Sequence, residues 1–174
     1  MEIEGKLGSV ILARLEPHAD LLESILEIAK RHKMKAGVIL SITGSLDRAV
    51  FQRFQPGRDS TQVIGVEEMV GPIESSGHGI IGIVDAPDRG DVPFGVGKYT
   101  HGDSYAHVHL TVTNATETVC GHVMPGCIVR SNHAVSHFTI MIAPIEEAAL
   151  KLRIDGTPDA GSRGVYHLLE TISA

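Results

Sequence analysis

Three of the ten histidines of this chain lie close together in the stretch YAHVHLTVTNATETVCGHVMPG, at His107, His109 and His122. Residues 114–117 form the only polar, turn-like break between two runs in which apolar and polar residues alternate. We therefore expect two antiparallel strands that are joined by a tight turn at this break. Pairing the strands about the turn sets His109 directly opposite His122. Any chemistry of these histidines therefore depends on the strand register, because the register decides which side chains share a face.

This register, in which Thr113 lies opposite Thr118, separates the hairpin side chains into two faces, because side chains alternate along a strand. One face carries Val108, Leu110, Val112, Val119, Gly121 and Val123. The opposite face carries His107, His109, Thr111, Cys120, His122 and Met124. We expect the apolar face to pack on a core and the three imidazoles to share the other face.

Three imidazoles on one face of a hairpin are suited to a single metal ion. Facing residues bring their Cβ atoms to about 5 Å, and Zn–N bonds are about 2.0–2.1 Å long, so the three rings can reach one ion. Neutral imidazoles bind zinc, and they also bind nickel, copper and iron. The sequence therefore predicts zinc or a similar divalent transition metal at His107, His109 and His122.

Further polar residues lie near these ligands in the sequence or on segments that reach the same face. Cys120 is either a fourth ligand or a small buried thiol. The others are candidates to act as an acid or base, to orient a ligand imidazole or to tune a pocket. These accessory candidates are Glu74, His78, His101, Asp103, Tyr105 and Arg130.

One helix and several strands are expected to position these residues. Residues 19–33 place apolar side chains at helical spacing, with Asp20 at the capping position and basic residues at the end. Strands are expected over residues 8–17, 36–45, 47–54, 63–70, 77–85, 134–144 and 149–155, with a further short element over 165–172. We expect Gly44-Ser45 to join the second and third strands, and the Gly-, Pro- and Asp-rich residues 86–104 to form a long loop over the site.

The composition is that of one globular domain over residues 1–174. Of the residues, 43% are hydrophobic, and the chain is too short to form two separate hydrophobic cores of stable size. The N-terminus lacks a secretory pattern and no apolar run is long enough to span a bilayer. Two cysteines are too few for a disulfide scaffold. We therefore expect a cytoplasmic protein with no membrane partner.

The charge argues against general affinity for nucleic acid. The formal net charge is -6, and the best basic run, KRHKMK at residues 30–35, stands at the end of the predicted helix. Basic side chains are favoured there by the helix dipole alone, and phosphate binding normally uses a wider basic surface. DNA binding is therefore not expected.

The chain resembles the PPC domain, the plant and prokaryote conserved domain, in its stand-alone prokaryotic form. The resemblance covers about residues 9–142 and leaves 143–174 as a C-terminal extension. It rests on LLESILEIAKRH, AGVILSITGSL and the pair His-x-His and Gly-His-x-x-x-Gly-Cys-x-Val-Arg. It implies a single-domain α/β fold, with a mostly antiparallel mixed β-sheet and one main α-helix, that assembles as a homotrimer and binds zinc through His107, His109 and His122.

Departures from the plant members limit what the resemblance implies. The chain has no Arg-Gly-Arg-Pro hook, and the plant Gly-Arg-Phe-Glu-Ile-Leu motif survives only as GPIE at residues 71–74. Two function classes stay open. One is a metal-binding module of the type commonly described as DNA-binding, and the other is a zinc-dependent enzyme that acts on a small polar substrate at the three histidines. A deep pocket around the ion favours an enzyme, and a flat basic rim favours nucleic acid.

Overall fold

The structure is a computed structural model of the whole chain, and it describes all residues except 58–61, 88–91, 95–96, 132–133, 156–163 and 174. The described residues form one α-helix and twelve strands. These elements are β1 Lys6–Leu7, β2 Ile11–Arg14, α1 Leu21–Arg31, β3 Gly37–Pro56, β4 Gln62–Asp85, β5 Val92–Phe94, β6 Gly97–Tyr99, β7 Ser104–Thr113, β8 Thr118–Val123, β9 Ile128–Val129, β10 Thr139–Glu146, β11 Ala148–Asp155 and β12 Gly164–Thr171.

Helix α1 forms where its amphipathic pattern predicts it. The carboxylate of Asp20 accepts a hydrogen bond from the backbone N–H of Glu23 at 3.1 Å, which satisfies one of the free donors of the first turn. Lys30 and Arg31 lie in the last turn, where the helix dipole favours positive charge. The buried stripe of the helix consists of Leu21, Ile25, Ile28 and Ala29.

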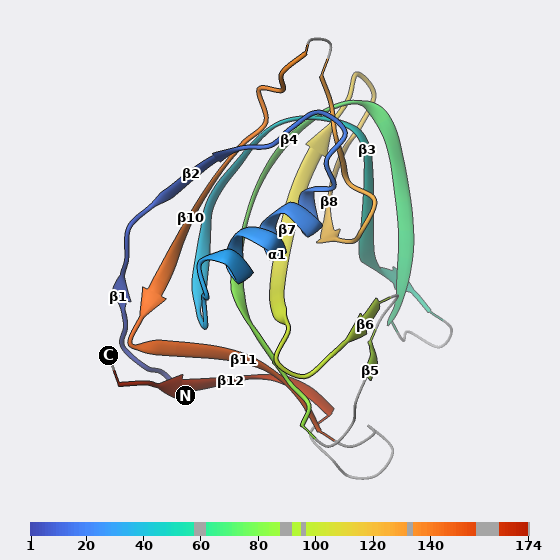
Figure 1. Cartoon of the computed structure of the whole chain (residues 1–174). Coiled ribbons are helices and arrows are strands. Elements are labelled where there is room, and N and C mark those ends of the chain that lie inside the picture. Colours follow the sequence, from blue (N-terminus) through green and yellow to red (C-terminus); the bar gives the residue numbers. More distant parts are fainter. Residues whose placement is uncertain (58–61, 88–91, 95–96, 132–133, 156–163, 174) are drawn as a thin grey trace.

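The sheet curves around this helix (Figure 1). Ten strands form one mixed sheet, and four of them close a ring of pairings in the order β3, β8, β7, β4 and back to β3. The apolar faces of these strands and the stripe of α1 share one core. Its largest fully buried side chains include Phe51, Phe138, Ile42, Leu46, Ile73 and Leu110. An α/β fold with one main helix and a mostly antiparallel mixed sheet is therefore confirmed.

The predicted break at Gly44-Ser45 is wrong. Strand β3 runs through both residues and pairs with β4 along almost its whole length, and β4 likewise joins the two strands expected at 63–70 and 77–85. Gly44 is required by packing instead of a turn, because a Cβ there would lie 2.5 Å from Cδ2 of Phe138. Gly71 is required in the same way, because a Cβ there would overlap the carbonyl oxygen of Leu46.

The expected loop over residues 86–104 is also corrected, because β5 and β6 pair with each other inside it. Farther along the chain, β11 pairs in parallel with β4, with Lys151 opposite Ile83, and β12 pairs antiparallel with β11. A second, smaller apolar cluster joins these strands to the end of β4 and the start of β7. It contains Val84, Ala86, Tyr105, Leu152 and Ile154, with Tyr99, Leu150 and Val165 packed against it. No helix in the described part of the chain is long and apolar enough to cross a membrane.

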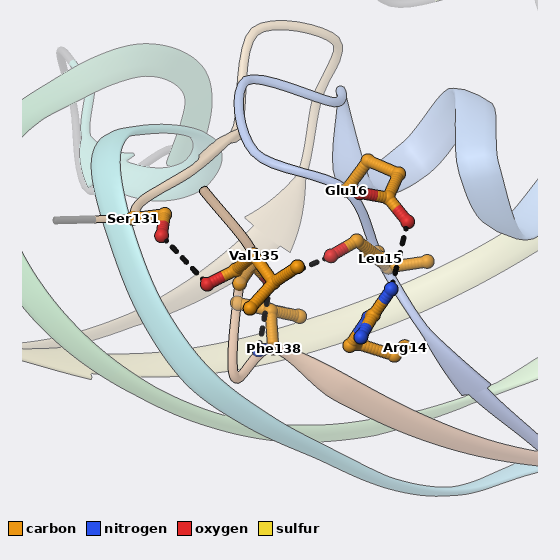
Figure 2. A network of polar contacts seen from close by, with 7 residues as sticks. Arg14, Leu15, Glu16, Ser131, Val135 and Phe138 are labelled. Atoms are coloured by element: carbon orange, nitrogen blue, oxygen red, sulfur yellow. Dashed lines mark hydrogen bonds and ion pairs between the residues drawn. The ribbon is translucent and has the colours of Figure 1, made fainter. Parts of the chain in front are cut away.

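A buried polar network fastens the chain after β2 to the start of β10 (Figure 2). The hydroxyl of Ser136, which is 1% exposed, donates to the carbonyl oxygen of Leu15 at 2.6 Å and accepts from the N–H of Phe138 at 2.9 Å. The N–H of Leu15 in turn donates to the carbonyl oxygen of Phe138 at 2.9 Å. These bonds hold Phe138 where it packs against Gly44.

Asp20 also reaches beyond the helix that it caps, because its second carboxylate oxygen accepts the N–H of Gly126 at 2.5 Å. We predict that Asp20→Ala lowers the free energy of unfolding by about 1–3 kcal/mol, since it removes a helix cap and leaves the Gly126 donor without its acceptor. Asp20→Asn should keep most of this stability, because asparagine also caps helices well. Urea unfolding of both variants tests the prediction, and an Asp20→Ala variant as stable as the wild type would contradict it.

Candidate metal centre

The β7–β8 hairpin has the register expected from its sequence. Thr113 lies opposite Thr118 and His109 lies opposite His122. The turn is held by the side-chain oxygen of Asn114, which accepts the backbone N–H groups of Thr116 at 2.9 Å and of Glu117 at 3.0 Å. This side chain replaces part of the missing backbone pairing at the turn and so sets the two strands in register.

The two faces of the hairpin separate as predicted. Val108, Leu110 and Val112 are at most 1% exposed and belong to the main core. His107 and His122 are half-buried and His109 is exposed, all on the opposite face of the sheet. The core therefore fixes the backbone from one side while the imidazoles stay accessible from the other.

The three imidazoles converge. Each of His107, His109 and His122 offers one ring nitrogen, and these atoms all lie within 4.8 Å of one another. The Nε2 atoms of His107 and His109 are 3.1 Å apart. Two nitrogens that bind one zinc ion tetrahedrally, at about 2.0–2.1 Å, lie about 3.3 Å apart. The donor set therefore fits zinc or a similar ion with little movement of the side chains.

Burial favours the neutral form of two of these rings, those of His107 and His122. Desolvation, followed by the nearby His109 and His167, lowers the pKa of His107. Desolvation, with smaller contributions from His107 and His109, lowers the pKa of His122 to about 4. A neutral imidazole is the form that binds metal, so these pKa shifts favour binding near neutral pH.

The structure adds a fourth histidine that the sequence analysis did not identify. His167 lies on β12, and its ring centroid is 5.8 Å from that of His107. Its Nε2 atom is 3.2 Å from the Tyr105 hydroxyl. Burial raises the pKa of Tyr105 and lowers the pKa of His167, so a neutral phenol and a neutral imidazole share this hydrogen bond. No local motif marks His167, because only the pairings of β4 with β11 and of β11 with β12 bring it near β7.

The histidines open into a cavity of about 550 Å³ between the hairpin, β3 and β12. It is lined by Gln52, Arg53, Phe54, Tyr99, Tyr105, His107, His109, Cys120, Gly121, His122, Leu152, Val165, Tyr166 and His167. A second hollow, of about 520 Å³, lies on the β4 side of the same imidazoles and is lined by Val38, Leu40, His78 and Ile80, among others. His107 and His109 therefore stand between two accessible spaces, whereas His122 lines only the first.

Three of the predicted accessory residues lie near the centre, and one of them is Tyr105, which lines the first cavity beside His167. Cys120 pairs with Thr111, is exposed and lines the first cavity, but it is not among the converging ligand atoms. His78 lies directly beside His109 on the neighbouring strand and lines the second hollow. Cys120 and His78 therefore lie beside the three ligands without joining the converging set.

The other accessory candidates lie elsewhere. Glu74 lines a separate hollow beside the Asn114 turn. The Nδ1 atom of His101 accepts the N–H of Ala86 at 3.1 Å, and the carbonyl oxygen of Asp103 accepts the N–H of Val84 at 2.9 Å, so both residues brace the chain around β4.

Arg130 donates to Asp47 at 2.6 Å and is not among the residues lining the histidine cavity. Two further histidines follow the hairpin closely in the sequence: His133 lies outside the described residues, and His137 is exposed just before β10.

Comparison with known proteins identifies the family of the chain. The family model of the Plants and Prokaryotes Conserved (PCC) domain matches residues 2–144. No curated protein matches significantly.

Several solved structures share the fold. A metal-containing protein from Archaeoglobus fulgidus is 19% identical, with a TM-score of 0.68 over 97% of this chain and 99% of that one. A plant- and prokaryote-conserved (PPC) protein from Pyrococcus horikoshii is 16% identical, with a TM-score of 0.64 over 100% and 99% of the two chains. A candidate DNA-binding protein from Ralstonia eutropha is also 16% identical, with a TM-score of 0.60 over 98% and 95%. At these identities the likeness shows the fold alone.

The lowered pKa of His122 predicts how the metal-free protein responds to acid. The unfolded chain takes up this proton near pH 6.5, whereas the folded chain resists it until about pH 4. The unfolded state therefore binds more protons across this window, and stability should fall as the pH drops from about 6.5 to about 4. Urea unfolding of chelator-treated protein measures this, and His122→Gln should flatten the slope. An unchanged slope in that variant would show that other groups cause it.

Proposed function

Because this chain belongs to the Plants and Prokaryotes Conserved (PCC) domain family and its three imidazoles converge, we propose that it binds one divalent transition metal ion, zinc first among them. The ligands are His107, His109 and His122. The observation that carries the proposal is the convergence of their ring nitrogens within 4.8 Å. A relative of the same fold that is described as metal-containing gives independent support.

The ligand set favours a site with an open position. Three neutral imidazoles suit zinc, and three protein ligands leave a fourth position for water or a bound molecule. When bound, such an ion lowers the pKa of a coordinated water and polarises a coordinated oxygen. The protein contributes the orientation of the three rings, which β7 and β8 hold from their buried face.

A zinc-dependent enzyme that acts on a small polar substrate is the second candidate. The observation that favours it is the cavity of about 550 Å³ onto which the three imidazoles open. The hydrogen-bonded pair Tyr105 and His167 lies at the edge of this cavity and offers a proton donor and acceptor close to the ligands. A concave space of this volume supports a small molecule more than a flat partner.

DNA binding receives less support. The basic residues Lys30, Arg31, Lys33 and Lys35 are exposed at the end of α1, but they form one short run in a chain of net charge -6. Phosphate recognition normally uses a wider basic surface. A relative described as a candidate DNA-binding protein shares only the fold, and function does not follow from fold.

Homotrimeric assembly is also part of the proposal. Phe54, Val66 and Val70 are 74%, 50% and 70% exposed. The pairing of β3 with β4 places them on one face, together with the Arg48–Glu68 ion pair, and we call these three apolar side chains the β3–β4 apolar strip. A strip of this kind is typical of a surface that a second copy covers. Phe54 also lines the histidine cavity, so a neighbouring copy would stand beside the metal centre.

We propose that the protein is located in the cytoplasm. Cys120 and Cys127 are both free thiols, and Cys120 is exposed. An exposed free thiol is typical of proteins in a reducing compartment.

We predict that His109→Ala lowers zinc affinity at least tenfold, because two imidazoles remain where a stable site needs three or four ligands. His78→Ala is the matched control, since His78 lies directly beside His109 on the neighbouring strand but outside the converging set, and it should keep full zinc binding. Elemental analysis and zinc titration of the chelator-treated proteins measure both. Full zinc occupancy in His109→Ala would overturn the proposed function.

We also predict that the wild type sediments with three times the mass of one chain at micromolar concentration. Val70→Asp should shift the protein towards the monomer, because it places a charge in the β3–β4 apolar strip. Leu12→Asp is the control, since Leu12 is similarly exposed, at 69%, on a different strand. A wild type that stays monomeric excludes the trimer, and a trimer that tolerates Val70→Asp places its interface elsewhere.

A further inference from the structure

The cavity beside the three histidines gathers most of the aromatic side chains of this chain. The whole sequence has three tyrosines, four phenylalanines and no tryptophan. All three tyrosines, Tyr99, Tyr105 and Tyr166, line this one cavity, together with Phe54. They come from β6, β7, β12 and β3, so the gathering is produced by the fold and by no local sequence pattern. Aromatic rings offer large apolar contact areas with a polar tip, which is typical of ligand pockets.

The remaining wall is apolar as well. Leu152, which is 2% exposed, and the half-buried Val165 face the cavity from the C-terminal strands β11 and β12. The volume of about 550 Å³ lies within the range of about 300–1,000 Å³ that is usual for small-molecule sites. A wholly polar ligand would offer these side chains no apolar surface to pack against. The body of the ligand should therefore be apolar and flat enough to lie among tyrosine rings.

The charge of the cavity is unlike that of the chain. The sequence has 21 acidic and 15 basic residues, yet none of the described residues that line the cavity is acidic. The lining includes Arg53 and four imidazoles. Arg53 donates to Glu67 through Nη1 at 2.5 Å, and its guanidinium has further N–H groups besides that one. A divalent ion at the histidines adds two positive charges, so the site selects for an anionic head group.

We propose that this cavity binds a small aromatic carboxylate. The carboxylate occupies the open position of the metal ion at His107, His109 and His122, and the ring lies among Tyr99, Tyr105, Tyr166 and Phe54. This inference rests on the proposed metal centre. It narrows the polar-substrate hypothesis, because it makes the ligand polar at one end only.

Calorimetry with zinc-loaded protein tests the proposal, and the zinc content of the same sample is measured first. The probes are 3-phenylpropanoate, propanoate, which has the head group alone, and 3-phenylpropanamide, which keeps the ring but loses the charge. We expect 3-phenylpropanoate to bind at least tenfold more tightly than either of the others. Its affinity should fall at least tenfold in chelator-treated protein, because the metal no longer holds the carboxylate.

Two variants test whether the aromatic side chains of the cavity hold the ring of the ligand. Tyr166→Ala should weaken 3-phenylpropanoate at least fivefold without changing zinc content, because Tyr166 lines the cavity but is not among the converging ligands. Tyr166→Phe keeps the ring and should bind almost as the wild type does. Thermal unfolding of both variants shows whether the fold is intact, and Phe54→Ala provides a second ring deletion on β3 if Tyr166→Ala does not fold.

The outcomes separate the two proposals. A protein that binds no zinc overturns both the metal centre and this inference. A protein that binds zinc but holds propanoate or 3-phenylpropanamide as tightly as 3-phenylpropanoate keeps the metal centre and overturns the aromatic carboxylate. If Tyr166→Ala or Phe54→Ala folds and still binds 3-phenylpropanoate as tightly as the wild type, the phenyl ring of the ligand does not lie among these aromatic side chains and the proposal is overturned.

Discussion

The pairing register of the β7–β8 hairpin is the constraint on which the rest of the centre depends. The side chain of Asn114 holds the turn by two hydrogen bonds to backbone N–H groups, and the turn sets His109 opposite His122. A shift of one residue would turn the imidazoles towards the core and the valines towards water. The buried face therefore specifies the site as strongly as the histidines do, because burial of Val108, Leu110 and Val112 stabilises only the register in which the rings converge.

The features that the sequence predicted well are those fixed by local physics. The helix over 21–31 follows from its apolar spacing and the Asp20 cap, and the hairpin follows from alternation about a polar turn. Gly44 misled the prediction because a glycine required by the ring of Phe138 looks the same in a sequence as a glycine required by a turn. His167 was missed because its position near His107 depends on a parallel pairing between strands that are far apart in the chain.

The cavity is lined by two parts of the chain, one inside the match to the family model and one beyond it. The three histidines lie within residues 2–144, which match the family model, whereas Leu152, Val165, Tyr166 and His167 lie beyond that match. The C-terminal hairpin of β11 and β12 joins the sheet through β4 and adds its own apolar cluster, so it is a structural wall of the cavity. The three converging histidines thus lie in the matched domain, and the surface that would meet a bound molecule is partly supplied by the segment that follows it.

The hydrogen bonds of the half-buried Asp20 bear on how a metal ion would exchange. Asp20 ties the start of α1 to Gly126, just after β8, so one side chain links the helix directly to the end of the β7–β8 hairpin. The ligand strands also rest on a core that is complete without an ion, unlike the small zinc modules that fold only around their metal. An ion can therefore enter or leave through the cavity while the backbone stays in place. The centre is preorganised, so the entropy of ordering the ligand strands is lost during folding and not when the ion binds.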